Sequence, residues 1–384
     1  MRRLLTFFTT GVLLLMSLGI GLFTADLPFW RRAIDLPLAA NESYVPTTLI
    51  AGHMGTLVAD VDSQRVTLDR TALETVTEQS RAAGADAVLV MHHGSLQLAR
   101  YYTGEPDSYF LRRPADFLAR TLVALAVGIA QAEGRIDSLD TPVSKWLTEW
   151  EGESRGAITL RQLLNETSGL ETGVDAAEVL GSRPFANISR LPKFATSRGV
   201  RLLLGNDFES TALGFQLEHE PGGFFNLSPV NAQLAAVIVE RATGLDYERF
   251  IADKLFAGGL DGTLELQMDR RSGMPAVHCC LRAEPAAILH IVEGIRSGRL
   301  EGLTAAWLAD MLRGSRANPQ FGLQLQKLEG TTPEVWHLGT GKGGGAWIVP
   351  EAGLSIVVLA RRDISTPVDI VEPLLASVSL AQRK

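Results

Sequence analysis

The stretch DFLARTLVALAVGIAQAEG, residues 116–134, decides the fold of this chain because it is apolar on nearly every side. A helix with that pattern is buried inside a globular protein. Asp116 is a good N-cap and Gly134 a good stop, so we expect the helix to fill the interval between them. Its first turn carries Phe117 and Arg120, and an arginine inside a buried helix requires an acidic partner or a ligand.

The composition is that of a globular protein with a mild excess of acidic residues. The chain has 384 residues, of which 46% are hydrophobic and 21% charged, and its net charge is −7. That length accommodates one large domain or two smaller ones with a sizeable core. Lysine and arginine form no basic block, so we expect no nucleic-acid partner.

The sequence offers no cofactor or metal motif. Its two cysteines, Cys279 and Cys280, are adjacent, and we expect two buried thiols because disulfide geometry favours separated side chains. The run GTGKGGGAW, residues 339–347, resembles a phosphate loop but lacks the Ser or Thr after its Lys. His92 and His93 point to opposite faces of a strand, so they do not chelate one ion. We predict no cofactor and no metal.

Residues 1–25 predict a membrane anchor. Two arginines precede a run without charged residues over 4–23. About 20 residues at 1.5 Å each cross the ~30 Å hydrocarbon layer of a bilayer. The arginines favour a cytoplasmic N-terminus, which places the body on the exported side, periplasmic or extracellular. A signal peptide cleaved after Ala25 or Gly19 and a twin-arginine export signal are the alternatives.

Residues 26–48 mix proline, aromatic and charged residues without clear periodicity, and we interpret them as a linker. Two arrangements are open for this segment. It either lies on the lipid headgroups through Phe29 and Trp30 or packs on the domain. The domain itself is expected to span residues 49–384.

Strand patterns lie near both ends of the chain, and helix patterns fill its middle. DAVLVMHHGSLQLARYY, residues 86–102, contains a His93–Gly94 turn, and GAWIVPEAGLSIVVLAR, residues 345–361, turns at Glu351–Gly353. The pattern predicts an α+β fold, with one antiparallel sheet built from both chain ends, flanking helices and an inserted all-helical region. The expected parts are sheet segments over 83–115 and 320–384 and a helical region over 116–319. Helices elsewhere or within that region are expected over 70–84, 158–170, 231–244, 247–256 and 366–381.

Five phrases, in order, resemble the serine β-lactamase and penicillin-binding-protein superfamily. They are GRIDSLDTPVSKWLTEW, ITLRQLLNETSGL, EPGGFF, QLAAVIVERATGLDYERFIADKLF and VPEAGLSIVVLARR. The branch that the chain resembles contains class C β-lactamases, related esterases and 6-aminohexanoate-oligomer hydrolases. The resemblance runs from Ala83 to the C-terminus. It implies the superfamily's fold, an antiparallel sheet from both chain ends with an inserted helical region.

The resemblance also implies where a catalytic site would lie, and there the sequence departs from the family. The family begins its buried helix with S-x-x-K, in which the Lys takes the proton of the nucleophilic Ser. Counting back from VGIA at residues 127–130, those positions fall on Phe117 and Arg120. Phe has no nucleophilic atom, and Arg stays protonated in proteins. The alternative register FLRR, residues 110–113, also gives Phe and Arg.

Two further motifs of the family are only partly matched. The Tyr of Y-x-N or Y-x-S falls on Leu227, and a shift of two places it on Phe225. The K-T-G or H-x-G motif is matched by His337 and Gly339, with residues 341–344 as the alternative. His337 is therefore the familiar polar group that the sequence retains.

These replacements predict a degenerate, membrane-anchored family member that is catalytically impaired and acts by binding. A peptide, a cell-wall fragment or another carboxylate ligand would occupy the cleft, with Arg120 as its charged partner. The rival hypothesis is that Arg120 pairs with an internal acid, because an unpaired buried charge is costly.

Two other functions stay open. The first is an active serine hydrolase, an amidase or esterase, whose catalytic residues have moved and act with His337. The hydroxyl groups considered for it are those of Ser108, Thr121, Ser168 and Ser228. The second is a membrane-attached interaction protein whose cleft is filled by Phe117 and Leu227.

Overall fold

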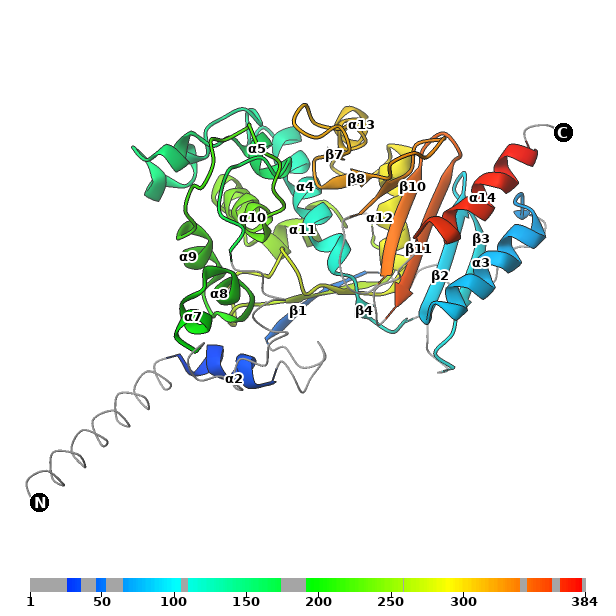
Figure 1. Ribbon diagram of the computed structural model, residues 1–384, viewed down its shortest axis with the longest axis horizontal. Helices are drawn as coiled ribbons and strands as arrows, with labels where there is room; N and C mark the ends of the chain where they lie inside the picture. The colour runs from blue at the N-terminus through cyan, green and yellow to red at the C-terminus, as the bar shows by residue number, and fades with distance from the viewer. Residues whose placement is uncertain are drawn as a thin grey trace, which may run out of the picture.

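The computed structural model describes residues 26–35, 46–52, 65–104, 110–173, 191–257, 259–338, 344–360 and 367–381. They form two antiparallel sheets, helices on both faces of the larger sheet, and a helical region beside it (Figure 1). The predicted anchor lies outside these residues. None of the helices in the described part combines the length and the hydropathy that a membrane span requires.

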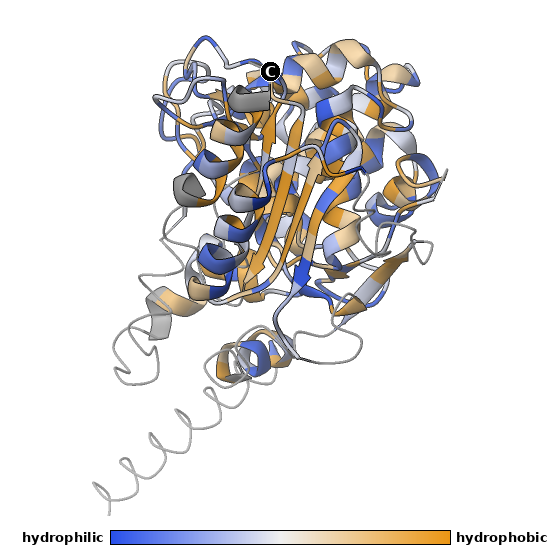
Figure 2. Cartoon of the chain, turned by 90° about the vertical axis from the view of Figure 1, so that its right-hand side faces the viewer, coloured by the Kyte–Doolittle hydropathy of each residue, from blue (hydrophilic) through white to orange (hydrophobic). Residues whose placement is uncertain are grey.

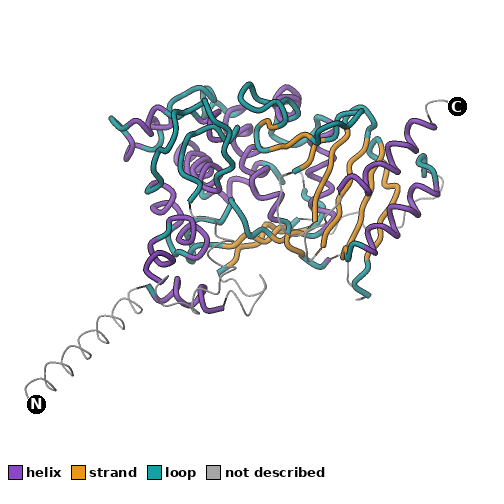
Figure 3. Tube along the Cα trace, in the orientation of Figure 1, coloured by secondary structure: helices purple, strands orange, loops and turns teal. Residues whose placement is uncertain are grey.

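The helices alternate with loops through the middle of the chain (Figure 3). The α-helices are α2 (Leu27–Asp35), α3 (Arg70–Ala82), α4 (Asp116–Ala132), α5 (Leu160–Leu164), α7 (Leu191–Thr196), α8 (Arg198–Leu204), α9 (Phe208–Leu213), α10 (Pro229–Thr243), α11 (Tyr247–Lys254), α12 (Pro285–Ser297), α13 (Ala305–Met311) and α14 (Pro367–Ala381). Short 3-10 helices are η4 (Val143–Lys145), η5 (Thr148–Trp150) and η6 (Ser154–Ala157). The helices predicted over 70–84, 231–244, 247–256 and 366–381 are confirmed to within a few residues at each end.

The larger sheet joins the two ends of the chain, as the sequence predicts. Its strands are β2 (Ala85–His92), β3 (Ser95–Tyr101), β7 (Phe321–Gly322), β8 (Leu325–Lys327), β9 (Trp336–His337), β10 (Gly344–Val349) and β11 (Leu354–Ala360). They follow the order β3-β2-β11-β10-β9-β8-β7, and each neighbouring pair is antiparallel. β2 and β3 meet at the predicted turn, where His93 and Gly94 have φ values of 47° and 78°, the left-handed conformation of a two-residue hairpin.

Both faces of this sheet are covered, and strand alternation decides which side chain packs where. Val88 and Val90 pack with α3 and α14 on one face. Ala87, Leu89 and Met91 belong to the other core, which includes α4 and α12. A strand buried on both faces is apolar along its whole length, as the colouring of the sheet shows (Figure 2).

A second, smaller sheet holds the start of α4 in place. Its order is β1-β5-β6-β4. The strands are β1 (Thr47–Ala51), β4 (Arg113–Pro114), β5 (Thr263–Gln267) and β6 (Arg282–Ala283). β5 and β6 lie within 116–319, so the prediction that this region is all-helical is wrong. β6 has only two residues. In β5 the alternation is limited to Leu264 and Leu266 on either side of the half-buried Glu265, which is too short a pattern to predict a strand from the sequence.

Helix α4 is the core helix that the sequence predicts. Every residue from Phe117 to Ala130 apart from Arg120 is buried, and the helix packs on α10. Gly134 has a φ of 71° and is confirmed as the stop. The prediction of Asp116 as N-cap is wrong, because the cap position is Ala115 and no side chain caps it. The Ala115 amide donates to the Leu281 carbonyl (2.8 Å), so the chain passes from β4 into α4 one residue earlier than predicted.

Helix α2 lies within the segment predicted as a linker. Phe29 has no exposed surface, and its ring centroid lies 5.8 Å from that of Phe194. Of the two arrangements open for this segment, the structure therefore has α2 packed on the domain. Phe29 is not available to lipid headgroups.

The expectation of two buried thiols is wrong, because Cys279 and Cys280 form a disulfide. The backbone of Cys280 is left-handed (φ 66°), and this conformation turns the neighbouring side chains towards each other. Both residues are half-buried and pack against the main core. They directly precede Leu281, whose carbonyl holds the entrance to α4.

Glu240, in the last turn of α10, makes stability depend on pH. Burial and nearby carboxylates raise the pKa of its carboxyl to about 7, although the Tyr247 amide donates to its Oε1 (2.9 Å). The folded state therefore binds this proton more tightly than the unfolded state. Its contribution to stability is fully present below the unfolded pKa of 4.5 and is lost as pH rises through about 7.

We expect Glu240→Gln to remove this dependence. The amide resembles the protonated acid and keeps an oxygen for Tyr247, so the variant should gain on the order of 2 kcal/mol above about pH 8 and change little near pH 4.5. Urea unfolding of the full chain in detergent at both pH values measures the difference. An equal gain at both pH values would contradict the assignment to this titration.

Candidate functional site

A buried carboxylate lies beside the first turn of α4. Glu166 follows α5 in a polar turn, its backbone is left-handed (φ 56°), and it has no exposed surface. Its Oε1 accepts from Gln324 Nε2 (2.8 Å), and its Oε2 accepts from Asn231 Nδ2 (2.6 Å) and the Ser228 amide (2.9 Å). One side chain therefore ties together the turn after α5, the start of α10 and the β7–β8 turn.

Arg120 is the charged partner of Glu166. Its Nη1 lies 3.8 Å from Glu166 Oε1, and its side chain is 24% exposed. This distance makes an ion pair but is too long for a hydrogen bond. Within the described residues the Arg120 guanidinium donates no hydrogen bond, so its fork of N–H donors has no acceptor among them. The hypothesis of an internal acid is thus confirmed, while donors remain for a ligand.

The charge of Glu166 depends on that arginine. Burial raises the pKa of the Glu166 carboxyl, whereas the positive charge of Arg120 and the hydrogen bonds from Ser228, Gln324 and Asn231 act in the opposite direction. Burial is the largest of these influences, so the pKa is raised overall, and removing the arginine would raise it further and favour the protonated acid. The pair is therefore one electrostatic unit.

His278 lies within the electrostatic reach of Arg120. Burial, and then the charge of Arg120, lower the pKa of the His278 imidazole to about 3, so the ring is neutral at physiological pH. Its Nδ1 lies 2.8 Å from Gln233 Oε1, which only accepts, so Nδ1 carries the proton. Its Nε2 is then an acceptor, and this atom is buried without a hydrogen-bond partner in the described part of the chain.

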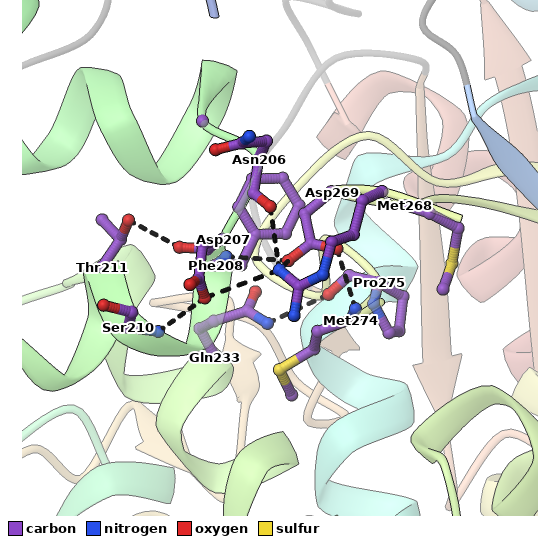
Figure 4. A network of polar contacts seen from close by, with 12 residues as sticks. Asn206, Asp207, Phe208, Ser210, Thr211, Gln233, Met268, Asp269, Met274 and Pro275 are labelled. Carbon is purple, nitrogen blue, oxygen red and sulfur yellow. Dashed lines mark hydrogen bonds and ion pairs between the residues drawn. The ribbon is translucent and has the colours of Figure 1, made fainter. Parts of the chain in front are cut away.

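Gln233, the partner of this imidazole, lies beside a network of polar contacts around Asp269 (Figure 4). Gln233 Nε2 donates to the Pro275 carbonyl (3.0 Å). The buried Asp269 accepts from the amides of Phe208 and Met274, at 2.9 Å each. These contacts join α9 and α10 to the loop after β5, which is a structural role.

The residues predicted for the family's site differ in exposure. Phe117 is 2% exposed and lies in the main core. Leu227 is 38% exposed, one residue before the amide that binds Glu166. His337 is buried on β9 and pairs in register with Gln326 on β8, the strand that follows the Gln324 turn. Gly339 lies outside the described residues.

An apolar rim borders this arrangement. Phe224 and Leu227 are 53% and 38% exposed, and the amide of Asn226, between them, donates to the Glu166 carbonyl (2.8 Å). The Phe224 ring contacts His219, with centroids 5.0 Å apart. We call Phe224 and Leu227 the apolar rim.

Two of the hydroxyl groups considered as relocated nucleophiles, those of Ser168 and Ser228, have structural partners. Ser168 Oγ donates to Asn231 Oδ1 (2.6 Å), and Ser228 Oγ donates to the Glu171 carbonyl (3.0 Å). Thr121 is fully buried, and Ser108 lies outside the described residues. Neither of the two serine hydroxyls donates to a group that could take its proton.

Sequence reasoning missed Glu166, Gln324 and His278. A signal for Glu166 was available, because an acid two residues after the leucine-rich LRQLL helix and shortly before a Ser-Gly turn is a candidate partner for a buried arginine. Gln324 and His278 carry no such signal, since each reaches the site through tertiary folding. Across the described ranges, no group of His, Cys, Asp and Glu side chains is arranged to hold a metal ion.

Comparisons with known proteins agree with this architecture. The sequence profile of the Beta-lactamase family matches residues 70–264, just over half of the chain. Protein flp of Staphylococcus aureus (strain MW2) is 27% identical over 137 residues, which are 35% of this chain and 24% of that protein. The match therefore spans about a quarter of that relative's length.

The solved structures that the fold resembles come from the same group of proteins. A proposed 6-aminohexanoate-dimer hydrolase from Bacillus anthracis has a TM-score of 0.66 at 15% identity, with 88% of this chain and 91% of that chain covered. A class C beta-lactamase has a TM-score of 0.56 at 15% identity, with 81% and 96% covered. These likenesses concern the fold. The profile match over half of the chain establishes that this chain belongs to the β-lactamase family.

Proposed function

We propose that this β-lactamase-family protein binds a carboxylate-bearing ligand at Arg120 and does not form an acyl-enzyme. We also propose that residues 4–23 attach it to a membrane, with the body on the exported side. The ligand class is a peptide or cell-wall fragment with an unblocked carboxyl group. The observation that carries the proposal is an arginine that donates no hydrogen bond within the described residues and is paired at 3.8 Å with a fully buried acid, where the family's base would lie.

The loss of acyl transfer follows from three side chains. Phe117 offers no nucleophilic atom and is buried. Arg120 keeps its proton and so cannot act as a base. Leu227 supplies no hydroxyl for proton transfer.

The proposed ligand binding uses the Arg120 guanidinium and the apolar rim. The Arg120 fork matches the two oxygens of a carboxylate. The exposed apolar rim offers surface to an uncharged part of the same ligand. The internal ion pair with Glu166 supports the same role, because it holds the guanidinium in place before a ligand arrives.

An N-acetylated dipeptide with a C-terminal carboxylate should bind the full-length chain in detergent more tightly than its C-terminal amide. Arg120→Met should weaken the carboxylate form about 10- to 100-fold, the range expected for a charge-assisted pair, and leave the amide form unchanged. Isothermal titration measures both affinities. Arg161→Met, on an exposed arginine paired with Asp140, is the matched control. Equal binding of both peptides to wild type would contradict the proposal.

A relocated hydrolase is the competing function. The hydrogen bonds of Ser168 and Ser228 argue against it, because both hydroxyls donate to amide oxygens, which cannot take a proton as a general base does. Covalent labelling with a fluorophosphonate separates the two hypotheses.

A further inference from the structure

Helix α2 has two unlike faces. Phe29 and Ala33 are 0% and 1% exposed and pack against α7 and α8. Leu27 and Ile34, seven residues apart and so on one face of the helix, are 51% and 44% exposed. The half-buried Trp30 and the exposed Arg31 lie between them in sequence. The outer side of α2 is therefore apolar, with an aromatic and a cationic residue beside it.

Exposed apolar residues of this size are few in the described part of the chain. They are Leu27, Ile34, Leu49, Phe224 and Leu227. Two of them form the apolar rim of the binding site. The other three are concentrated in α2 and β1, the first described elements. Both elements lie along the same edge of the molecule (Figure 1).

The inner side of α2 is fixed to the body. The Arg32 guanidinium donates to the carbonyls of Gly205 and Asp269. Asp26 forms an ion pair with Arg201, whose guanidinium lies 4.2 Å from the centroid of the Phe29 ring. These contacts join α2 to the end of α8 and to the loop after β5. Because these contacts fix α2 to the body, the angle at which α2 lies on a membrane would also set the orientation of the body.

The sequence before α2 decides what the outer side faces. The uncharged run over 4–23 ends four residues before Leu27. Four residues reach at most ~14 Å when fully extended. If the run enters a bilayer, as the proposed function holds, the start of α2 stays within ~14 Å of the hydrocarbon layer, at or just outside the lipid headgroups. An apolar helix face flanked by Trp and Arg is suited to that zone.

We infer that the outer side of α2 (Leu27, Trp30, Arg31 and Ile34) lies in the phospholipid headgroup region and sets how the body stands on the membrane. The occupant of this surface is the bilayer itself. Arg31 provides the charge that anionic headgroups attract. This inference rests on the proposed membrane attachment, and it adds a second, orienting contact to it.

Photo-crosslinking to lipid tests the inference on the full-length chain. The protein is reconstituted into nanodiscs of phosphatidylcholine and phosphatidylglycerol, together with a phosphatidylcholine that carries a diazirine in its upper acyl chain. Cleavage on the amino side of aspartate releases residues 1–25 and Asp26–Ile34 as separate peptides. We expect lipid adducts on both peptides. Leu27→Glu with Ile34→Glu should lower the adduct yield on the second peptide about tenfold and leave the first unchanged.

Controls make each outcome decisive. Phe224→Glu changes an exposed apolar residue of the rim and should not alter labelling of Asp26–Ile34, and circular dichroism verifies that every variant is folded. Adducts on 1–25 without adducts on Asp26–Ile34 would overturn the inference, by showing that chain or solvent covers this face, while membrane attachment stands. Labelling that the double substitution does not reduce would overturn it as well. An absence of adducts on both peptides would refute the attachment itself.

Discussion

Full-length protein incubated with a fluorophosphonate or with a penicillin will keep its intact mass unchanged. An adduct requires a nucleophile and a group that takes its proton, and under the proposed function the positions for these hold the buried Phe117 and the permanently protonated Arg120. Loss of the nucleophile in a serine hydrolase lowers the rate by about a millionfold. Labelling should therefore be undetectable under conditions in which an active class C β-lactamase is fully modified.

The same experiment can refute this proposal. An adduct on the folded wild-type chain would mean that a reactive hydroxyl exists, and peptide mapping would identify it. Mapping to Ser168 or Ser228 would establish the relocated hydrolase and require one of their hydrogen bonds to rearrange. Ser228→Ala and His337→Gln would then each abolish labelling if these two residues acted together.

Glu166→Ala should lower the free energy of unfolding by about 3–5 kcal/mol, the largest change that we expect from a single substitution in this chain. The substitution leaves Gln324, Asn231 and the Ser228 amide without their acceptor and Arg120 without its counter-charge. Urea unfolding in detergent, followed by circular dichroism, measures the change. The dipeptide of the binding test should also lose affinity, because the guanidinium is no longer held in place.

Two variants calibrate this result. Glu153→Ala removes a 47% exposed carboxylate from its pair with Arg155 and should cost less than about 1 kcal/mol. Glu166→Gln keeps the size and one acceptor oxygen, so its effect should lie between those of the other two. A loss below about 1 kcal/mol for Glu166→Ala would show that water readily replaces the carboxylate.

Much of the fold was predictable because its strongest signals are local. The apolar α4, the His93–Gly94 turn and the β10–β11 hairpin each lie in one short stretch. The second sheet was not predictable in this way. β4 and β6 have two residues each, and their pairing depends on segments far apart in sequence. The disulfide was missed because spacing alone gives no account of a left-handed backbone at Cys280.

The site was predictable in outline and not in detail. Position within α4 was enough to single out Arg120 and to expect a buried acid. Which acid it is could not be derived, because Glu166 reaches Arg120 only after α5 and α10 pack against α4. The side chains that bind Glu166, such as Asn231 and Gln324, reach it through the same packing. No periodic pattern in the sequence identifies them.

The pairing of β2 with β11 has a consequence for how the chain is made. Val88 and Val358 are partners in the larger sheet, although they come from segments near opposite ends of the sequence. Synthesis of the chain therefore leaves an apolar strand edge on β2 unpaired until the last strand emerges, and such edges recruit other chains. Non-local pairing of this kind also slows folding. A premature stop before Leu354 would remove the strand that holds the two halves of the sheet together, so the product should aggregate rather than fold with a trimmed end.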